Sequence, residues 1–200
     1  MKTLFSIFLF LLATADLYAQ KSVPKGNFSE LVQREVGDLN NDKRDDIIVL
    51  EMDVEDETGP LRVQIFLSQP NGKLRLAVSS TQIMESQYPP NKHGEHNGNT
   101  IPDFFIEEGK LRMLTDIDGR KSCYEFRFRQ NNFELVKISR VYWNGKNTTF
   151  ETEIDLIAKT KIQFEQELGS DEIFNKRKKA IKINSLPKIQ DLGFSDLEQY

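Results

Sequence analysis

Apolar and polar residues alternate along much of this chain, and short runs of turn-forming residues separate the alternating segments. A period of two places successive side chains on opposite faces of a β-strand. The apolar residues that mark the expected strands are Ile48, Leu50, Met52 and Val54; Leu61, Val63, Ile65 and Leu67; Leu74, Leu76 and Val78; Leu111 and Met113; Tyr124, Phe126 and Phe128; and Phe150, Ile154 and Leu156. The pattern predicts a mainly β protein built from an antiparallel meander.

Turn signals and one long irregular segment divide these strands. Asn71-Gly72 and Asn144-Gly145 each lie between alternating segments, where Asn-Gly is the strongest short-range signal for a β-hairpin. Residues 79–102 break the alternation and contain both histidines. We expect a long surface loop there, of a kind that is often functional or mobile.

A short C-terminal helix is expected over residues 170–180. Ser170 can cap its start, and the basic residues 176–179 favour its C-terminal end. We interpret this basic run as a solvated helix end, with contact to a polyanion or an anionic lipid as the alternative. Four apolar residues of the tail are expected to pack back on the sheet: Ile189, Leu192, Phe194 and Leu197. The expected fold is a mainly β, single-domain antiparallel meander with a short C-terminal helix.

The first residues have the order of a secretory signal peptide. Lys2 supplies a positive start, Leu4 to Ala13 is a short apolar run, and Ala19 is a small residue suited to cleavage ahead of Gln20. We therefore expect a signal peptide over 1–19, with a second possible cut after Ala15, and a single β-rich domain over 20–200. No later segment is apolar and long enough to span a membrane, so the cleaved protein is expected to be periplasmic or secreted.

Composition narrows the possible partners. The formal net charge is −4 and the isoelectric point is near 5.4, so no nucleic-acid surface is expected. Cys123 is the single cysteine, so no internal disulfide can form. We expect an unknown protein or glycan partner in the cell envelope or outside the cell.

The segment 38–46 is the one motif with specific chemistry. Asp38, Asn40, Asp42 and Asp46 stand at positions 1, 3, 5 and 9 of a loop, and Arg44 can add its backbone carbonyl from position 7. Calcium prefers six to eight hard oxygen ligands, and a short loop supplies them from alternate residues. The spacing predicts one structural calcium ion, and the alternative is an ion-free turn rich in Asp and Asn.

The loop departs from an EF-hand because position 6 is Lys43 rather than Gly and position 12 is Val49 rather than Glu. It resembles the calcium loop of FG-GAP and VCBS-type repeats, in which a strand follows directly. With the stretch 69–77, it also resembles exported bacterial proteins that carry one such loop before a β meander and imply no activity. The missing Gly predicts an uncommon backbone conformation at Lys43, costing roughly 1 kcal/mol.

Signals for catalysis are weaker. His93, Glu95 and His96 could in principle hold a transition metal, although the surrounding residues favour a polar loop. Cys123 is expected to be a packed thiol. The chain lacks the Gly-x-Ser-x-Gly, His-Glu-x-x-His and phosphate-loop motifs. We therefore expect an exported, non-enzymatic binding or interaction module, and the alternative is a periplasmic or secreted hydrolase acting on cell-wall or glycan substrates.

Overall fold

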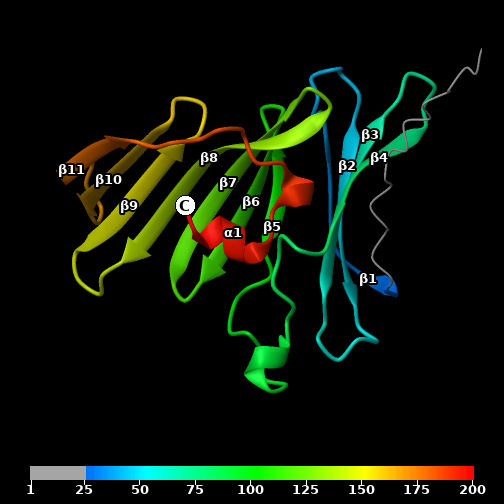
Figure 1. Cartoon of the computed structure of the whole chain (residues 1–200), viewed down its shortest axis with the longest axis horizontal. Helices are drawn as coiled ribbons and strands as arrows, with labels where there is room; N and C mark the ends of the chain where they lie inside the picture. Colours follow the sequence, from blue (N-terminus) through cyan, green and yellow to red (C-terminus); the bar gives the residue numbers. More distant parts are fainter. Residues whose placement is uncertain (1–25) are drawn as a thin grey trace, which may run out of the picture.

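Figure 1 shows the chain as a computed structural model, which describes residues 26–200, so the expected signal peptide lies outside the described residues. This part of the chain forms two antiparallel sheets, in the strand orders β1-β2-β3-β4 and β11-β10-β9-β8-β7-β6-β5. Every pair of neighbours in each sheet is consecutive in the sequence, so both sheets are meanders. The mainly β prediction is confirmed.

The strands are long and are joined by short turns, apart from one segment. Their bounds are β1 Phe28–Gly37, β2 Asp46–Asp53, β3 Leu61–Ser68, β4 Leu74–Ser80, β5 Asp103–Glu107, β6 Lys110–Ile117, β7 Arg120–Arg129, β8 Asn132–Trp143, β9 Thr148–Asp155, β10 Thr160–Glu167 and β11 Ile173–Ala180. Residues 81–102 form the expected long connection, which contains only the short 3-10 helix η1, Pro90–Lys92.

The two sheets share one hydrophobic core. One buried cluster contains residues of both sheets: Leu61, Val63 and Ile65 of β3, Met113 of β6 and Tyr124 of β7. The alternation along β3 is complete, because its odd positions are buried and its even positions are partly exposed. Period-two patterning therefore identified the core face of this strand correctly.

A β-bulge explains why two leucines of β4 are exposed. Val78 pairs with Ile65 on the core face, but a register shift follows, and Leu76 pairs with Phe66 instead. An extra residue in one strand moves the later side chains to the other face. Leu74 and Leu76 therefore point to solvent. Val54, which we grouped with β2, lies beyond that strand and is also exposed.

The predicted helix over 170–180 is wrong. Residues 173–180 form strand β11, which pairs antiparallel with β10. The capping and charge signals were local, whereas the backbone hydrogen bonds of the β10–β11 hairpin are tertiary and outweigh them. A bulge at Asn175, with φ 55°, shifts the register of the two strands at Phe164, where two residues of β11 oppose one of β10. The short C-terminal helix is instead α1, Phe194–Glu198.

The C-terminal segment covers the inner face of the larger sheet only near its middle. It runs from β11 across β8, where Leu135 N–H donates to the carbonyl oxygen of Pro187 (2.8 Å), through the 3-10 helix η2, Ile189–Asp191, to α1 (Figure 1). Ile189, Leu192 and Leu197 are buried, as expected for the tail. The far end, β9 to β11, extends beyond most of this cover (Figure 1). Most side chains of β9 and β10 are partly exposed, and most of those of β11 are exposed.

Candidate functional site

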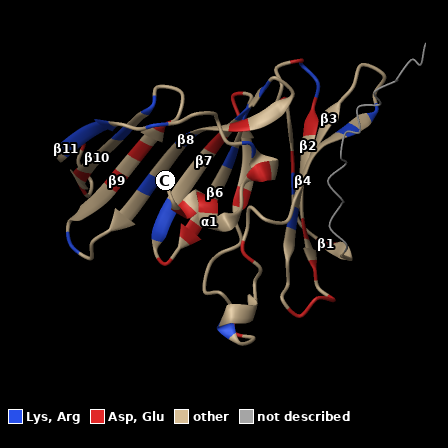
Figure 2. Ribbon diagram, in the orientation of Figure 1, with Lys and Arg blue, Asp and Glu red and all other residues tan. Residues whose placement is uncertain are grey.

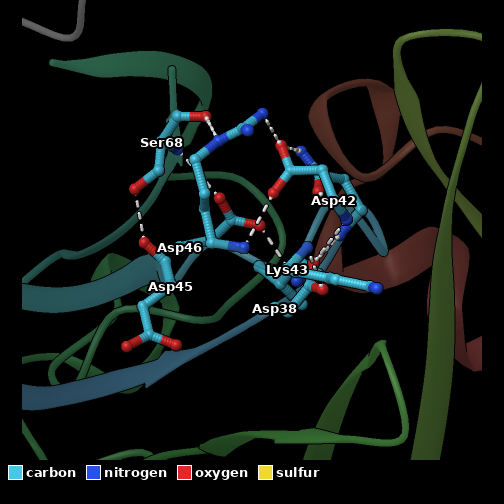
Figure 3. A network of polar contacts seen from close by, with 9 residues as sticks. Asp38, Asp42, Lys43, Asp45, Asp46 and Ser68 are labelled. Atoms are coloured by element: carbon cyan, nitrogen blue, oxygen red, sulfur yellow. Dashed lines mark hydrogen bonds and ion pairs between the residues drawn. The ribbon is translucent and has the colours of Figure 1, made fainter. Parts of the chain in front are cut away.

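The acidic loop between β1 and β2 is held by its own hydrogen bonds (Figure 3). Asp38 organises its first half: Oδ1 accepts from the backbone N–H of Asn40 (3.2 Å) and of Asp42 (3.1 Å), and Oδ2 accepts from that of Lys43 (2.7 Å). Lys43 has φ 67°, so the uncommon backbone conformation predicted from its sequence position is confirmed.

Asp42 is bound by the residues on either side of it. Its Oδ1 accepts from the backbone N–H of Arg44 (3.0 Å), and its Oδ2 accepts from Asn40 Nδ2 (3.0 Å). The Arg44 guanidinium also reaches Oδ2 at 2.5 Å, and Arg44 Nε donates to the carbonyl oxygen of Ser68 at 3.4 Å. The positive charge of Arg44 is therefore paired with the carboxylate of Asp42, the central acidic residue of the loop.

Asp46 is fully buried where the loop enters β2. Its two oxygens accept from backbone N–H groups on different segments, Oδ2 from Leu39 and Oδ1 from Ser68, each at 2.9 Å. Burial raises the pKa of this carboxyl, and the charges of Asp42 and Asp38 add to the rise, while the two hydrogen bonds oppose it. Asp46 therefore connects the loop to the end of β3.

The donor types suit calcium, but the arrangement is that of a hydrogen-bonded turn. Asp38, Asn40 and Asp42 bring hard oxygens to one short loop. Asp46 uses both oxygens on backbone groups, and Arg44 neutralises Asp42. Within residues 26–200, no group of three His, Cys, Asp or Glu side chains is placed to hold a metal ion. Each carboxylate oxygen still has lone-pair capacity beyond the bonds it accepts.

The loop also packs against the other sheet. Gly109, at the β5–β6 turn with φ 71°, lies so close to the loop that a Cβ added there would be 2.6 Å from Asn41 Oδ1. Gly37, at the end of β1, is similarly close to Ile106 of β5, so that a Cβ added there would press on the Ile106 side chain. These close approaches place the acidic loop at the junction of the two sheets, a location that the sequence pattern did not indicate.

The two histidines do not form a metal site with their neighbours. His96 uses both ring nitrogens, since Nδ1 accepts from the backbone N–H of Gly98 (3.0 Å) and Nε2 lies 3.2 Å from Gln87 Oε1. His93 is exposed, in a left-handed conformation that ends η1. The chemistry of this segment is that of a self-bonded loop.

Cys123 is a half-buried residue of β7 on the outer face of the larger sheet. Burial raises the pKa of its thiol; the charge of Arg112 opposes this rise, and the charge of Glu125 adds to it. A raised pKa lowers the fraction of thiolate, which is the nucleophilic form. Cys123 therefore has the properties of a packed thiol.

The uncovered end of the larger sheet carries a feature that sequence reasoning missed. Tyr142 of β8 and Phe150 of β9 are cross-strand partners on the inner face, and they are 49% and 46% exposed. Phe150 was grouped with Ile154 and Leu156 on the apolar face of an expected strand, whereas Tyr142 was not singled out. Tyr142 and Phe150 are exposed because the first sheet and the C-terminal segment do not extend this far.

A shallow groove of about 360 Å³ lies beside Phe150 on this end of the sheet. Its inner-face lining comes from β9, β10 and β11, and consists of Phe150, Thr152, Gln163, Glu165, Asn175 and Arg177. The acidic loop and this groove are the two candidate sites in the described part of the chain.

Comparison with known proteins adds no identity to these two sites: no protein-family model matches the chain, nor does any curated protein or solved structure.

Proposed function

We propose that the protein is an exported, non-enzymatic binding module whose contact surface is the uncovered end of the seven-stranded sheet. The observation that carries this proposal is the exposed cross-strand pair of Tyr142 and Phe150. Large aromatic side chains supply much of the energy at binding surfaces, and contiguous exposed apolar groups mark such surfaces. Trp143, the next residue along β8, is 56% exposed but lies on the opposite face, outside this surface.

The hydrolase alternative has less support. Glycoside hydrolysis requires two carboxyl groups that converge on one bond. The two carboxylates beside the groove, Glu151 and Glu165, lie on neighbouring strands but on opposite faces. Glu165 pairs with inner-face Phe150, whereas Glu151 pairs with Phe164. Cys123, the one thiol, has a raised pKa and lies on the outer face.

We also propose that the acidic loop binds calcium in a structural role, as its resemblance to FG-GAP and VCBS-type loops implies. Asp38, Asn40, Asp42 and Asp46 with the Arg44 carbonyl would hold the ion, which would neutralise the carboxylates between the two sheets. Binding would displace the Arg44 guanidinium from Asp42, so the affinity should be weak.

Residues 26–200 include no helix with the length and apolar character needed to span a membrane.

Export is tested by mass spectrometry of the protein from the cells that make it. Cleavage should leave an N-terminus near Gln20, or near Asp16. A cytoplasmic product that begins at Met1 or Lys2 would contradict the proposal.

Binding is tested by co-sedimentation of the purified mature protein with insoluble cell-envelope material from the same cells. The wild type should sediment, and the double variant Tyr142→Ser, Phe150→Ser should stay in solution with an unchanged melting temperature. Equal sedimentation of both proteins would contradict the assigned surface. Treatment of the envelope material with protease then tells a protein partner from a glycan partner.

A further inference from the structure

We propose that the groove across β9, β10 and β11 binds an oligosaccharide that carries carboxylate groups. This inference rests on the proposed binding function and names the chemistry of the partner. It follows from three properties of the inner face at this end of the sheet: an exposed aromatic platform, a row of positive charges that no Asp or Glu side chain of the described residues pairs with, and neutral and acidic hydrogen-bonding groups between them.

The aromatic platform is the Tyr142–Phe150 pair. Phe150 lines the groove, and its cross-strand partner Tyr142 continues the same face toward β7. Sugar rings present C–H groups on their faces, and these pack on aromatic side chains as other apolar groups do. The platform is therefore suited to a flat ring with polar edges.

The positive charges lie on the strands next to this platform. Lys161 of β10 and Lys179 of β11 are cross-strand partners, and Arg177 lies two residues before Lys179 on the same face. Like charges directly opposite one another destabilise a sheet. Among the described residues, none of these three cations forms an ion pair with an Asp or Glu side chain.

Lys161 lies close to other cations, and its side chain makes a polar contact with the C-terminal segment. Lys161 donates to the backbone oxygen of Tyr200 at 3.2 Å. Burial lowers its pKa, and the charges of Lys179 and Arg140 lower it further. Figure 2 shows that β11 is predominantly basic, although the whole chain has a net charge of −4. An anionic ligand would relieve the repulsion that the sheet itself leaves in place.

Neutral and acidic hydrogen-bonding groups occupy the floor between the ring and the cations. Gln163 of β10 pairs with Thr152 on one side and with Arg177 on the other. Asn175 donates from Nδ2 to Glu165 Oε1 at 2.8 Å, which fixes both side chains at the edge of the groove. Amides, a hydroxyl and a carboxylate accept and donate hydrogen bonds, as the hydroxyl groups of a sugar require.

This combination favours an acidic glycan over other anions. A polyphosphate or a charged lipid surface would require mainly cations, and Glu165 on the same face would oppose it. A carboxylated sugar uses all three elements together, because its ring packs on Phe150, its hydroxyls bond the amides, and its carboxylate pairs with Arg177. Arg suits a carboxylate because its planar guanidinium can donate two parallel hydrogen bonds.

The experiment measures binding of the mature protein to defined tetramers by isothermal titration calorimetry. The probes are tetragalacturonate and tetramannuronate, with neutral cellotetraose and a tetraglutamate peptide as controls. At least one uronate tetramer should bind more tightly than both controls. Loss of a charge-assisted contact costs about 1.5–3 kcal/mol. Arg177→Ala should therefore weaken binding by roughly tenfold or more.

The alternation of β11 supplies a matched control. Lys178 is equally basic but pairs with Ile162 on the outer face, so Lys178→Ala should leave affinity within about twofold, whereas Lys179→Ala should reduce it severalfold. Phe150→Ala should weaken binding, and Trp143→Ala, on the outer face, should not. All variants are compared with the wild type by thermal melting, because a variant that fails to fold gives no binding result and is replaced by Arg177→Gln or Phe150→Leu.

Three results would overturn the assignment. Binding of neither uronate excludes it, and equal binding of tetraglutamate makes the groove a site for acidic peptide instead. Equal losses for Lys178→Ala and Lys179→Ala indicate diffuse charge attraction. None of these results would change the outcome of co-sedimentation with envelope material, which depends on Tyr142 and Phe150. Failure of the glycan assignment is therefore distinguishable from failure of the binding function.

Discussion

The side-chain amide of Gln33 bonds both backbone groups of Phe104, across the junction of the two sheets. Gln33 Oε1 accepts from the Phe104 N–H at 2.9 Å, and Gln33 Nε2 donates to the Phe104 carbonyl oxygen at 2.6 Å. Phe104 lies on β5, an edge strand whose outward backbone groups lack a neighbouring strand. One glutamine of β1 therefore takes the place of a strand at this point and ties the two edges together.

Gln33→Leu should destabilise the protein by about 1–3 kcal/mol, because it leaves the Phe104 N–H and carbonyl without their partner at a half-buried site. The free energy of unfolding is measured in urea. Gln64→Leu is the matched control, since Gln64 is a strand glutamine of the first sheet whose amide makes only one long contact, 3.5 Å to Ser79 Oγ. Equal effects of the two substitutions would show that the Gln33 bridge does not join the sheets.

The sequence was informative wherever the structure depends on local pattern. Period-two alternation identified β3 and its buried face, and Asn-Gly marked the β3–β4 and β8–β9 hairpins. It failed where distant segments decide the outcome. Residues 173–180 have helix-compatible signals, yet pairing with β10 makes them a strand.

The two candidate sites also differ in how much of each could be predicted from the sequence. The acidic loop was found because its ligand spacing is continuous in sequence, and the conformation of Lys43 followed from the missing Gly. The contact of this loop with Gly109 was not predictable, because it joins segments nearly 70 residues apart. Exposure of Phe150 depends on where the C-terminal segment stops covering the sheet, so alternation alone assigned it to the core.

Calcium should stabilise the protein weakly. Extracellular calcium modules often bind at about 10⁻⁴ to 10⁻³ M, and a tenfold excess over such a constant adds about 1.4 kcal/mol. The melting temperature should rise by a few degrees between chelator and millimolar calcium. Asp42→Ala should abolish the rise, because it removes the central carboxylate of the loop.

Two variants test the mechanism of this weak affinity. Lys43→Gly should enlarge the calcium response, because it relieves the backbone conformation at φ 67° and removes a charge. Arg44→Ala should also enlarge it, since it frees Asp42 from the guanidinium at 2.5 Å, while lowering stability in chelator. If wild type and all three variants respond alike, the loop is only a turn.

The buried carboxyl of Asp46 should make stability depend on pH in a defined direction. Its pKa is raised above the ordinary value of 3.8, mainly by burial, so the folded protein binds this proton more tightly than the unfolded chain. The contribution of Asp46 to stability should therefore fall as the pH rises from about 4 through the folded pKa. The stability of the wild type relative to Asp46→Asn, measured in urea from pH 4 to 7, should decrease over that interval.

The asparagine variant controls for the many other carboxyls, because only Asp46 differs between the two proteins. Asp46→Asn should itself lower stability by about 1–3 kcal/mol at low pH, since its amide nitrogen would face one of the backbone N–H donors of Leu39 and Ser68. A relative stability that increases with pH would mean that the two hydrogen bonds outweigh burial and lower the pKa.

Cys123 should react slowly with iodoacetamide in the folded protein. Burial raises the pKa of its thiol, with smaller effects from Arg112 and Glu125, and only the thiolate attacks the reagent. The midpoint of the alkylation rate against pH should therefore lie above the midpoint for the same protein unfolded in urea, where the thiol is near its unperturbed pKa of about 8.5. Cys123 is the single cysteine, so mass spectrometry follows this one site without interference. A folded-state midpoint at or below the unfolded one would mean that the thiol is activated, and it would contradict the assignment of Cys123 as a packed thiol.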